Sequence, residues 1–483
     1  MFDEDDWRSL WEDRCMPTRP ADNLQSAPFT RREVLRIGGS GLGGLTLASL
    51  LRADAIAGTA SSRKSVIFVH LDGGPPQHET IDPKPLAPSE IRGPGDSIAT
   101  ALPGFFMGEH LPQMAQLAEK FVFIRSLVGS AGRHDAFQCQ SGYAQKDLES
   151  LGGRPAMGSV VSHLFGRPDD PAPPFIDLMQ GRPLVRNSAR PGFLGPAFQP
   201  FRPDISHLFH RELEPGMKGE LARQGKNHTL ELSLNGTLTA DRLDTRQGLL
   251  ASLDRIRRDL DAGGMMDAMD QFNQQAVGIL TSGRLADAID LESEDPEVLQ
   301  RYTAPGDPES LASYTSDGPL ASRKFLLARR LIEAGARVVS LSVSDFDTHK
   351  ENFPRMKQVL PIVDHGLCTL VSDLDERGLL DDVTIVAWGE FGRTPNINKN
   401  GGRDHWPRVG PCLMAGGGMN AGCVIGETDR LAAEPRRRPV TYKDVFCTVY
   451  RNLGVDPRQA TLIDPQGRPQ YLLDAGEPLH EVV

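Results

Sequence analysis

The sequence predicts an α/β protein, a three-layer α/β/α sandwich with a mainly parallel central sheet. Two patterns support this fold class. Short apolar runs rich in β-branched residues alternate with segments of helical periodicity, and these runs are continuously apolar along their length. Strands that are apolar on both sides are typical of a sheet covered by helices on both faces.

Strands are expected at 65–71 ("SVIFVHL"), 120–128, 336–344, 382–388 and 411–417, and helices at 244–292, 318–335, 353–378 and 441–453. Thr441, followed three residues later by Asp444, predicts a capped start for the last helix. Gly378 predicts the end of the preceding one. The segment 165–240 is rich in Pro, Gly, Arg and Phe and lacks clear periodicity, so an irregular insertion is expected there.

Composition excludes some function classes. With 39% hydrophobic and 24% charged residues, the 483-residue chain is typical of a soluble globular protein. A formal net charge of −11 and the lack of a basic stripe argue against nucleic acid as a partner. The six cysteines have no zinc-finger or redox spacing, and their apolar context favours buried free thiols.

The N-terminus is typical of an export signal. An acidic leader precedes the paired Arg31 and Arg32 and a glycine-rich apolar run too short to span a bilayer. Ala55 and Ala57 fit the small-x-small rule for cleavage after Ala57. We therefore expect a leader and twin-arginine (Tat) signal over 1–57 and a single domain over 58–483. The Tat machinery would be a partner, the location periplasmic or extracellular, and no stable membrane span would remain after cleavage.

Polar side chains follow the predicted strands where sites of open α/β sheets lie. Carboxylates and imidazoles delivered by separate strands form the ligand set of a divalent cation such as zinc or manganese. Gly401 and Gly402 would allow the last segment to approach the others closely. The residues are Asp72 after the first strand; Ser130, Arg133 and His134 after the second; Asp345, Asp347 and His349 after the third; and Glu390, Arg393, Asp404 and His405 after the fourth.

Three of these residues also have a structural interpretation. Asp72 alone would cap a turn, His349 alone would be solvated, and His405 beside Trp406 would be a packed histidine. Their joint position at one edge of one sheet favours a shared metal site.

Five ordered motifs carry a resemblance to a known family: "DGGPPQHETIDPKP", "RHDAFQCQSG", "SDFDTHKENF", "GEFGRTP" and "GGRDHWP". Together with the Tat signal they closely resemble the domain of unknown function 1501 family, from about residue 64 to the C-terminus. That family is similar to a branch of the alkaline phosphatase and sulfatase superfamily. The resemblance implies an alkaline-phosphatase-like fold with metal ligands at strand ends.

The resemblance also implies site residues. Asp72 matches the first-strand metal aspartate, Asp345 and His349 match a D-x-x-x-H pair, and His405 matches a late histidine ligand. The superfamily's next Asp-His pair is Glu390-Phe391 here; the glutamate could ligate but the phenylalanine could not. A second metal site would therefore be impaired or rebuilt, with His134 or Asp404 as candidates.

The implied function is an exported metal-dependent hydrolase of phosphate or sulfate esters that uses zinc, manganese or calcium. Its substrate would be an anionic ester, either a small molecule or a polysaccharide. Ser130 is the nearest hydroxyl for a nucleophile, His134 would protonate the leaving group, and Arg133 and Arg393 would bind the anion. The alternative is a non-catalytic binding or structural protein stabilised by a metal. Peptidase and dehydrogenase motifs are missing.

Overall fold

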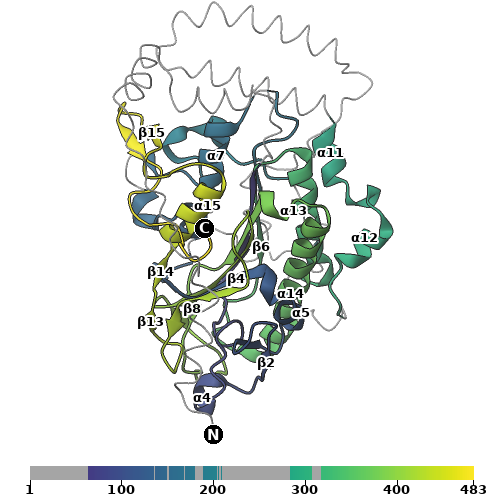
Figure 1. Cartoon of the computed structure of the whole chain (residues 1–483), viewed down its shortest axis with the longest axis vertical. Helices are drawn as coiled ribbons and strands as arrows, with labels where there is room; N and C mark the ends of the chain where they lie inside the picture. Colours follow the sequence, from purple (N-terminus) through teal and green to yellow (C-terminus); the bar gives the residue numbers. More distant parts are fainter. Residues whose placement is uncertain are drawn as a thin grey trace, which may run out of the picture. The chain divides into compact units, whose positions relative to one another are not determined.

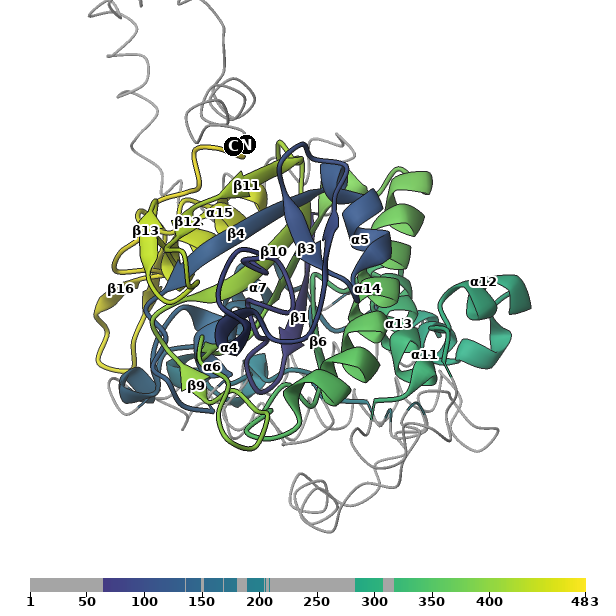
Figure 2. The ribbon, with the colours of Figure 1, turned by 90° about the horizontal axis from the view of Figure 1, so that it is seen from below.

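An eight-stranded sheet is the centre of the described part of the chain (Figures 1 and 2). The computed structural model describes residues 64–134, 136–148, 152–167, 169–179, 189–203, 205, 208, 283–306 and 317–483. Strands lie in the order β11–β4–β10–β7–β1–β6–β5, and β14 pairs with β4. Their bounds are β1 Ser65–Leu71, β4 Phe121–Val128, β5 Phe175–Leu178, β6 Val338–Val343, β7 Val383–Trp388, β10 Gly410–Gly416, β11 Cys423–Ile425 and β14 Val440–Thr441.

The sheet is mainly parallel, as predicted. β1 pairs in parallel with β6 and β7, β6 with β5, and β4 with β11 and β14. Only β10 runs against its neighbours β4 and β7 among the described strands of this sheet. The carboxyl ends of β1, β4, β6 and β7 therefore share one edge with the start of β10.

Helices cover both faces of the sheet, which confirms the predicted fold class. On one side lie α13, α14 and α5, and on the other α7, α15 and α6 (Figures 1 and 2). Their bounds are α5 Pro112–Gln116, α6 Phe137–Ser141, α7 Met157–Phe165, α13 Arg323–Ala334, α14 Asn352–Glu376 and α15 Tyr442–Asn452.

Shorter elements connect these layers. The helices are α4 Ser89–Arg92, α11 Arg284–Ile289 and α12 Pro296–Arg301. Paired short strands are β2 Ser97–Ala99 with β3 Phe106–Gly108, β8 Gly392–Arg393 with β9 His405–Trp406, β12 Glu427–Thr428 with β13 Pro435–Arg437, and β15 Thr461–Ile463 with β16 Pro469–Tyr471. 3₁₀ turns occur at Ala118–Lys120, Gln145–Leu148, Gly192–Leu194, Pro196–Phe198, Leu291–Ser293, Pro319–Ser322 and Leu380–Asp382.

The central strands are buried along their whole length. Every residue of β1, β6, β7 and β10 is buried, and the rings of Phe68 on β1 and Trp388 on β7 stack at 6.4 Å. Removing this apolar surface from water stabilises the sheet and explains why the strands are continuously apolar in sequence. All five predicted strands are present within two residues of their expected ends.

Helix ends also follow the sequence. Thr441 and Asp444 form the predicted capping box of α15, and Gly378 follows α14 with a φ of 68°. In the predicted irregular insertion, by contrast, Phe175–Leu178 forms the edge strand β5. Most of the predicted 244–292 helix, and the predicted export signal with Arg31 and Arg32, lie outside the described residues.

The described cysteines are buried thiols, as expected. Cys139, Cys368, Cys412, Cys423 and Cys447 are all buried, and no disulfide joins them. Among the described helices, none combines the length and apolar character needed to cross a bilayer.

Candidate metal centre

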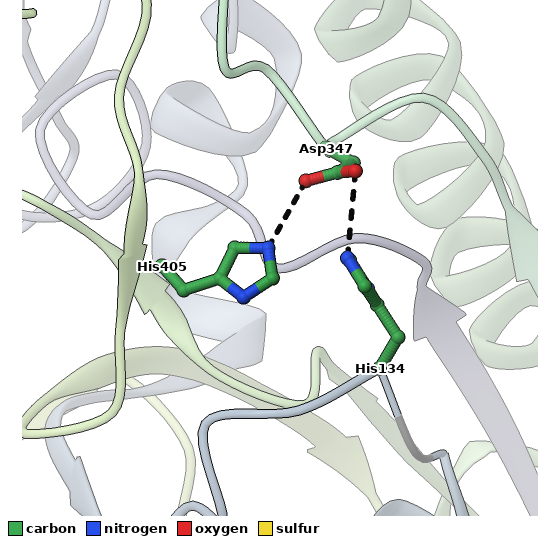
Figure 3. Close-up of side chains that lie close together, drawn as sticks. All are labelled: His134, Asp347 and His405. Carbon is green, nitrogen blue, oxygen red and sulfur yellow. Dashed lines mark hydrogen bonds and ion pairs between the residues drawn. The ribbon is translucent and has the colours of Figure 1, made fainter.

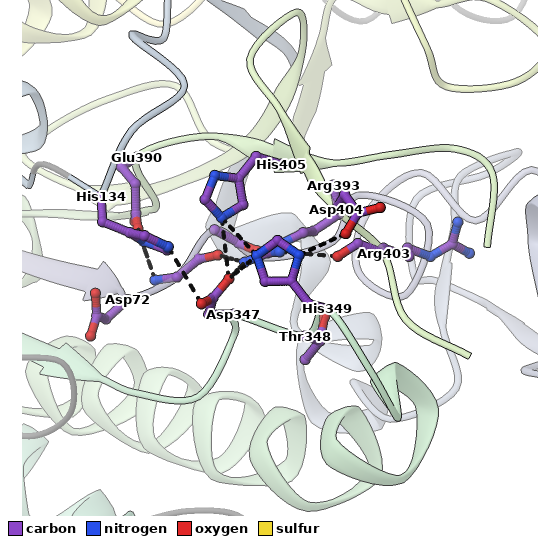
Figure 4. Close-up of polar contacts among 12 residues, drawn as sticks. Asp72, His134, Asp347, Thr348, His349, Glu390, Arg393, Arg403, Asp404 and His405 are labelled. Atoms are coloured by element: carbon purple, nitrogen blue, oxygen red, sulfur yellow. Dashed lines mark hydrogen bonds and ion pairs between the residues drawn. The ribbon is translucent and has the colours of Figure 1, made fainter. Parts of the chain in front are cut away.

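The polar residues that follow the strands meet at one edge of the sheet (Figure 4). Asp72 directly follows β1, Ser130 lies two residues after β4, and Glu390 lies two residues after β7. His405 comes from the opposite direction, because β9 precedes the antiparallel strand β10. The reversed strand therefore begins where the others end, and this brings His405 to the site.

A carboxylate surrounded by imidazoles lies at the centre (Figures 3 and 4). Asp347 Oδ1 lies 3.1 Å from His349 Nε2 and 3.3 Å from His405 Nε2. On the other side, Asp347 Oδ2 lies 3.4 Å from His134 Nε2. The Nε2 atoms of His349 and His405 are themselves 3.1 Å apart. These four residues are called the Asp347 cluster.

A second, fully buried group lies beside the first. His70 Nε2 is 3.4 Å from Glu390 Oε2 and 3.8 Å from Asp72 Oδ1. One ligand atom from each of the three residues lies within 4.8 Å of the others. His134 joins the two groups, because its Nδ1 lies 3.0 Å from Glu390 Oε1 while its Nε2 faces Asp347. His70, Asp72 and Glu390 are called the His70 cluster.

Two glycine contacts allow the loops to approach this closely. A Cβ atom on Gly73 would lie 2.3 Å from the backbone nitrogen of Asp347, and one on Gly402 would lie 2.2 Å from the His349 carbonyl. Gly73 also donates its N–H to Glu390 Oε1 at 3.0 Å. Gly402 thus has the role predicted for it. Gly401 has open space around its Cβ position and a φ of +66°, so it contributes through backbone conformation.

Arg393 is fully buried and holds Asp347 in place. Its Nη2 donates to Asp347 Oδ1 at 2.7 Å and to the Gly73 carbonyl. Its Nε donates to the Gly74 carbonyl at 3.2 Å, and its Nη1 to the Arg403 carbonyl at 3.0 Å. Because its guanidinium is engaged by these four partners, Arg393 positions the Asp347 carboxylate. Binding of substrate by Arg393 stays a prediction.

A carboxylate outside the cluster orients His349. Asp404 Oδ1 accepts a hydrogen bond from His349 Nδ1 at 2.6 Å, which leaves Nε2 to face Asp347 and His405. Asn398 supports the pair, donating to the His349 carbonyl at 2.9 Å and to Asp404 Oδ1 at 3.3 Å. This is the arrangement in which a carboxylate fixes the tautomer of a metal-binding histidine.

Charges in the Asp347 cluster favour the ionised forms. Burial would raise the pKa of Asp347, but hydrogen bonds from two imidazoles and from Arg393 hold it well below its ordinary value. For His134, burial lowers the pKa, but its hydrogen bonds with Asp347 and Glu390 outweigh this effect and raise the pKa to about 9. The cluster therefore contains an ionised Asp347 beside a protonated His134, and the ring nitrogens of His349 and His405 are left as candidate ligand atoms.

In the His70 cluster, burial favours the uncharged forms of both Asp72 and His70. Burial raises the pKa of Asp72 well above its usual range, and the nearby charges of Glu390 and Asp345 raise it further. Burial lowers the pKa of His70. Neither ring nitrogen of His70, nor Oδ2 of Asp72, has a hydrogen-bond partner among the described residues. Buried polar atoms in this state are costly and call for a partner.

Donors and charges in both clusters fit a divalent cation. Carboxylate oxygens and imidazole nitrogens are ligands of zinc and manganese. A bound cation would also give a partner to the buried atoms of His70 and Asp72 that lack hydrogen bonds among the described residues.

The remaining predicted residues have distinct positions. Ser130 Oγ donates to the Glu390 carbonyl at 2.5 Å and accepts from Gly132 N–H at 3.0 Å, so its hydroxyl organises the loop. Arg133 is exposed, with its charge accessible to an anion. Asp345 is buried and has a φ of 78°, but neither cluster includes it. Catalysis by Ser130 and metal binding by Asp345 stay predictions.

The sequence pattern favours Asp345 over its neighbour Asp347 and does not single out His70. Both aspartates lie in the "SDFDTH" motif, and the D-x-x-x-H spacing from His349 favours Asp345. His70 lies inside the apolar run "SVIFVHL" that predicts the first strand. An ionisable residue inside an otherwise apolar strand was the signal that could have identified it.

Comparison with known proteins identifies the family of this chain but no relative of curated function. No protein of curated function matches its sequence significantly. Solved structures with similar folds include the PsFucS1 sulfatase from Pseudoalteromonas sp. (12% identity, 84% of this chain and 71% of that one, TM-score 0.35). The phosphonate monoester hydrolase from Silicibacter pomeroyi is another (11%, 82% and 74%, 0.32). A third is BT4656 in complex with its substrate D-glucosamine-2-N,6-O-disulfate (12%, 86% and 81%, 0.31).

These likenesses to solved structures are distant. The family model described as "Protein of unknown function (DUF1501)" matches residues 63–483. The matched region includes every residue of the Asp347 and His70 clusters. The chain belongs to the DUF1501 family.

Proposed function

We propose that this protein is an exported metal-dependent hydrolase of phosphate or sulfate esters. The observation that carries the proposal is the convergence of His134, His349 and His405 on the Asp347 carboxylate at one edge of the sheet. Asp347, His349 and His405 would hold the cation. When bound, a divalent cation supplies Lewis-acid polarisation of the phosphoryl or sulfuryl oxygen.

Side chains around the cluster suit the other steps. Arg133 is exposed and would bind the anionic group, since a guanidinium fork matches its oxygens. His134 is 36% exposed and would donate a proton to the leaving oxygen as the P–O or S–O bond breaks. The attacking oxygen would come from water or from Ser130, which would first have to release the Glu390 carbonyl.

Turnover of an aryl phosphate and an aryl sulfate by the purified protein, with added zinc, manganese or calcium, tests the proposal. We expect His349→Ala and His405→Ala each to lower kcat at least 100-fold. His480→Ala should have no effect, because that side chain is 79% exposed outside the site. Activity unchanged in both site variants would overturn the proposal. Ser130→Ala separates the nucleophiles, since activity is retained only if water attacks.

A second function is a non-catalytic binding or structural protein stabilised by its metal. It is favoured by one observation: the Ser130 hydroxyl and the Arg393 guanidinium are both engaged in internal hydrogen bonds. Tightly bound metal, a large fall in Tm on chelation and no ester hydrolysis with any of the three metals would support this function instead.

Export by the twin-arginine route is part of the proposal. It is supported by Arg31, Arg32 and the apolar run that follows them. Replacing both arginines with lysine in the full chain should leave the protein in the cytoplasm of a bacterial host, whereas the unaltered chain should be found in the periplasm or medium. Equal export of both chains would contradict it.

A further inference from the structure

We propose that the His70 cluster is a second cation site, in which a histidine within strand β1 completes a ligand set with Asp72 and Glu390. This inference rests on the proposed metal-dependent function and gives the centre a second cation. The cation would be one that accepts mixed nitrogen and oxygen donors, such as zinc or manganese.

The register of the sheet explains why these three residues meet. His70 on β1 pairs with Trp388 on the parallel strand β7. Side chains two residues apart on a strand point to the same face. Asp72 and Glu390 each lie two residues beyond this pair, just past the strand ends, and their carboxylates lie 3.8 and 3.4 Å from His70 Nε2. Two neighbouring strand ends thus deliver the oxygens, and the strand itself delivers the nitrogen.

The burial of His70 is difficult to explain without a ligand. Its side chain is 1% exposed, and neither ring nitrogen has a hydrogen-bond partner among the described residues. An imidazole buried in this way costs free energy that an apolar residue in the same strand would not. Its Nε2 nevertheless faces Glu390 Oε2 at 3.4 Å and Asp72 Oδ1 at 3.8 Å, with both carboxylates buried.

Charge balance leads to the same conclusion. Glu390 accepts Gly73 N–H and contacts His134, and Asp347 pairs with Arg393. For Asp72, the ion-pair distance among the described residues is the 3.8 Å to His70, and its Oδ2 has no hydrogen bond. A divalent cation would supply the positive charge that these buried carboxylates need.

Phe391, the residue after Glu390, has no ligand atom, so the nitrogen donor of this site has to come from another element, which is strand β1. Its ring stacks on His405, with centroids 4.2 Å apart and planes 27° apart, and lies edge-on to His134 at 5.3 Å. The residue after Glu390 therefore packs against the Asp347 cluster and offers no ligand atom. His70 provides an imidazole next to Glu390 from a different element.

Metal content per chain tests this inference. The full domain, stripped by chelator, would be loaded with zinc, passed through a desalting column and analysed by inductively coupled plasma mass spectrometry. We expect two zinc ions per chain in the unaltered protein and one in His70→Leu. Asp72→Asn should also lose one. His110→Gln, a half-buried histidine outside both clusters, should keep two.

The outcomes separate this inference from the proposed function. Two ions retained in both His70→Leu and Asp72→Asn, or one ion in the unaltered protein that both variants keep, would overturn the second site and leave the first. No bound ion in the unaltered protein would overturn both proposals.

Thermal unfolding adds a readout that does not depend on counting ions. In metal-free protein, His70→Leu should raise Tm, because it removes an unpartnered buried imidazole. The increase in Tm on adding zinc should be smaller in this variant than in the unaltered protein. A purely structural histidine would instead give a lower Tm without metal and an unchanged increase with it.

Discussion

The Nε2 atoms of His349 and His405 lie 3.1 Å apart, although 56 positions separate the two residues in the chain. One imidazole follows a parallel strand, and the other precedes the antiparallel strand β10. Asp347 Oδ1 lies within 3.3 Å of both nitrogens. Facing nitrogens need a shared proton or cation between them, and the adjacent carboxylate would stabilise either one.

Asp404→Asn tests the orientation of His349. The 2.6 Å contact from His349 Nδ1 to Asp404 Oδ1 presents Nε2 to the site, and a neutral amide would hold the ring less firmly. We expect zinc affinity to fall roughly 10- to 100-fold, as for other carboxylates behind metal-binding histidines. Competition with a chromophoric chelator measures this. Asp474→Asn, at a surface pair with Lys443, is the control; equal affinities in the two variants would argue against orientation by Asp404.

Gly402→Ala tests the close approach of the last loop. The new Cβ would lie 2.2 Å from the His349 carbonyl, so the backbone beneath His349 must move. We expect a fall in zinc affinity of at least tenfold. Gly401→Ala has free space but a φ of +66°, so it should cost about 1 kcal/mol of stability and leave affinity unchanged. If both variants bind zinc like the unaltered protein, the contact does not shape the site.

Glu79→Gln tests a buried ion pair beneath the site. Arg403 Nη2 lies 2.7 Å from Glu79 Oε1, and the side chains are 0% and 8% exposed. Removing one charge leaves the other buried without a counter-charge, so unfolding free energy from urea titration should fall by about 3–5 kcal/mol. Glu427→Gln, in an exposed pair with Arg436, should cost less than about 1 kcal/mol. A similar cost in both would contradict this account.

The sequence was most informative where one physical pattern decides the structure. Continuous apolar runs located β1 and β7, because only doubly covered strands need them. β5 was missed because its four residues become a strand only by pairing with β6. The antiparallel direction of β10 could not be predicted either, since direction leaves no local sequence pattern.

In the site, the residue types and the sheet edge were predictable, and the choice between neighbours was not. Asp345 and Asp347 lie two residues apart in the irregular segment that follows β6. Asp347 is the one that faces the histidines, and Asp345 has a φ of 78°, a conformation that non-glycine residues adopt too rarely to be expected from sequence. His70 required knowledge of the β1–β7 register, which places it next to Glu390.

His78 should make stability depend on pH in mildly acidic solution. Burial, aided by the charges of Arg403 and Lys84, lowers its pKa from 6.5 to about 3, while the Leu431 carbonyl acts in the opposite direction. The unfolded chain therefore binds a proton below pH 6.5 that the folded chain excludes. The contribution is complete above pH 6.5 and is lost as the pH falls towards 3, by roughly 2–3 kcal/mol between pH 7 and 4.5.

His78→Gln keeps a donor for the Leu431 carbonyl, which lies 2.9 Å from His78 Nε2, and removes the titrating group. Urea unfolding at pH 7, 5.5 and 4.5 should therefore show a smaller loss of unfolding free energy on acidification than in the unaltered protein. His480→Gln replaces a side chain that is 79% exposed and should reproduce the unaltered dependence. If the His78→Gln protein loses stability on acidification as steeply as the unaltered protein and His480→Gln, protonation of the buried imidazole is not the cause of the loss.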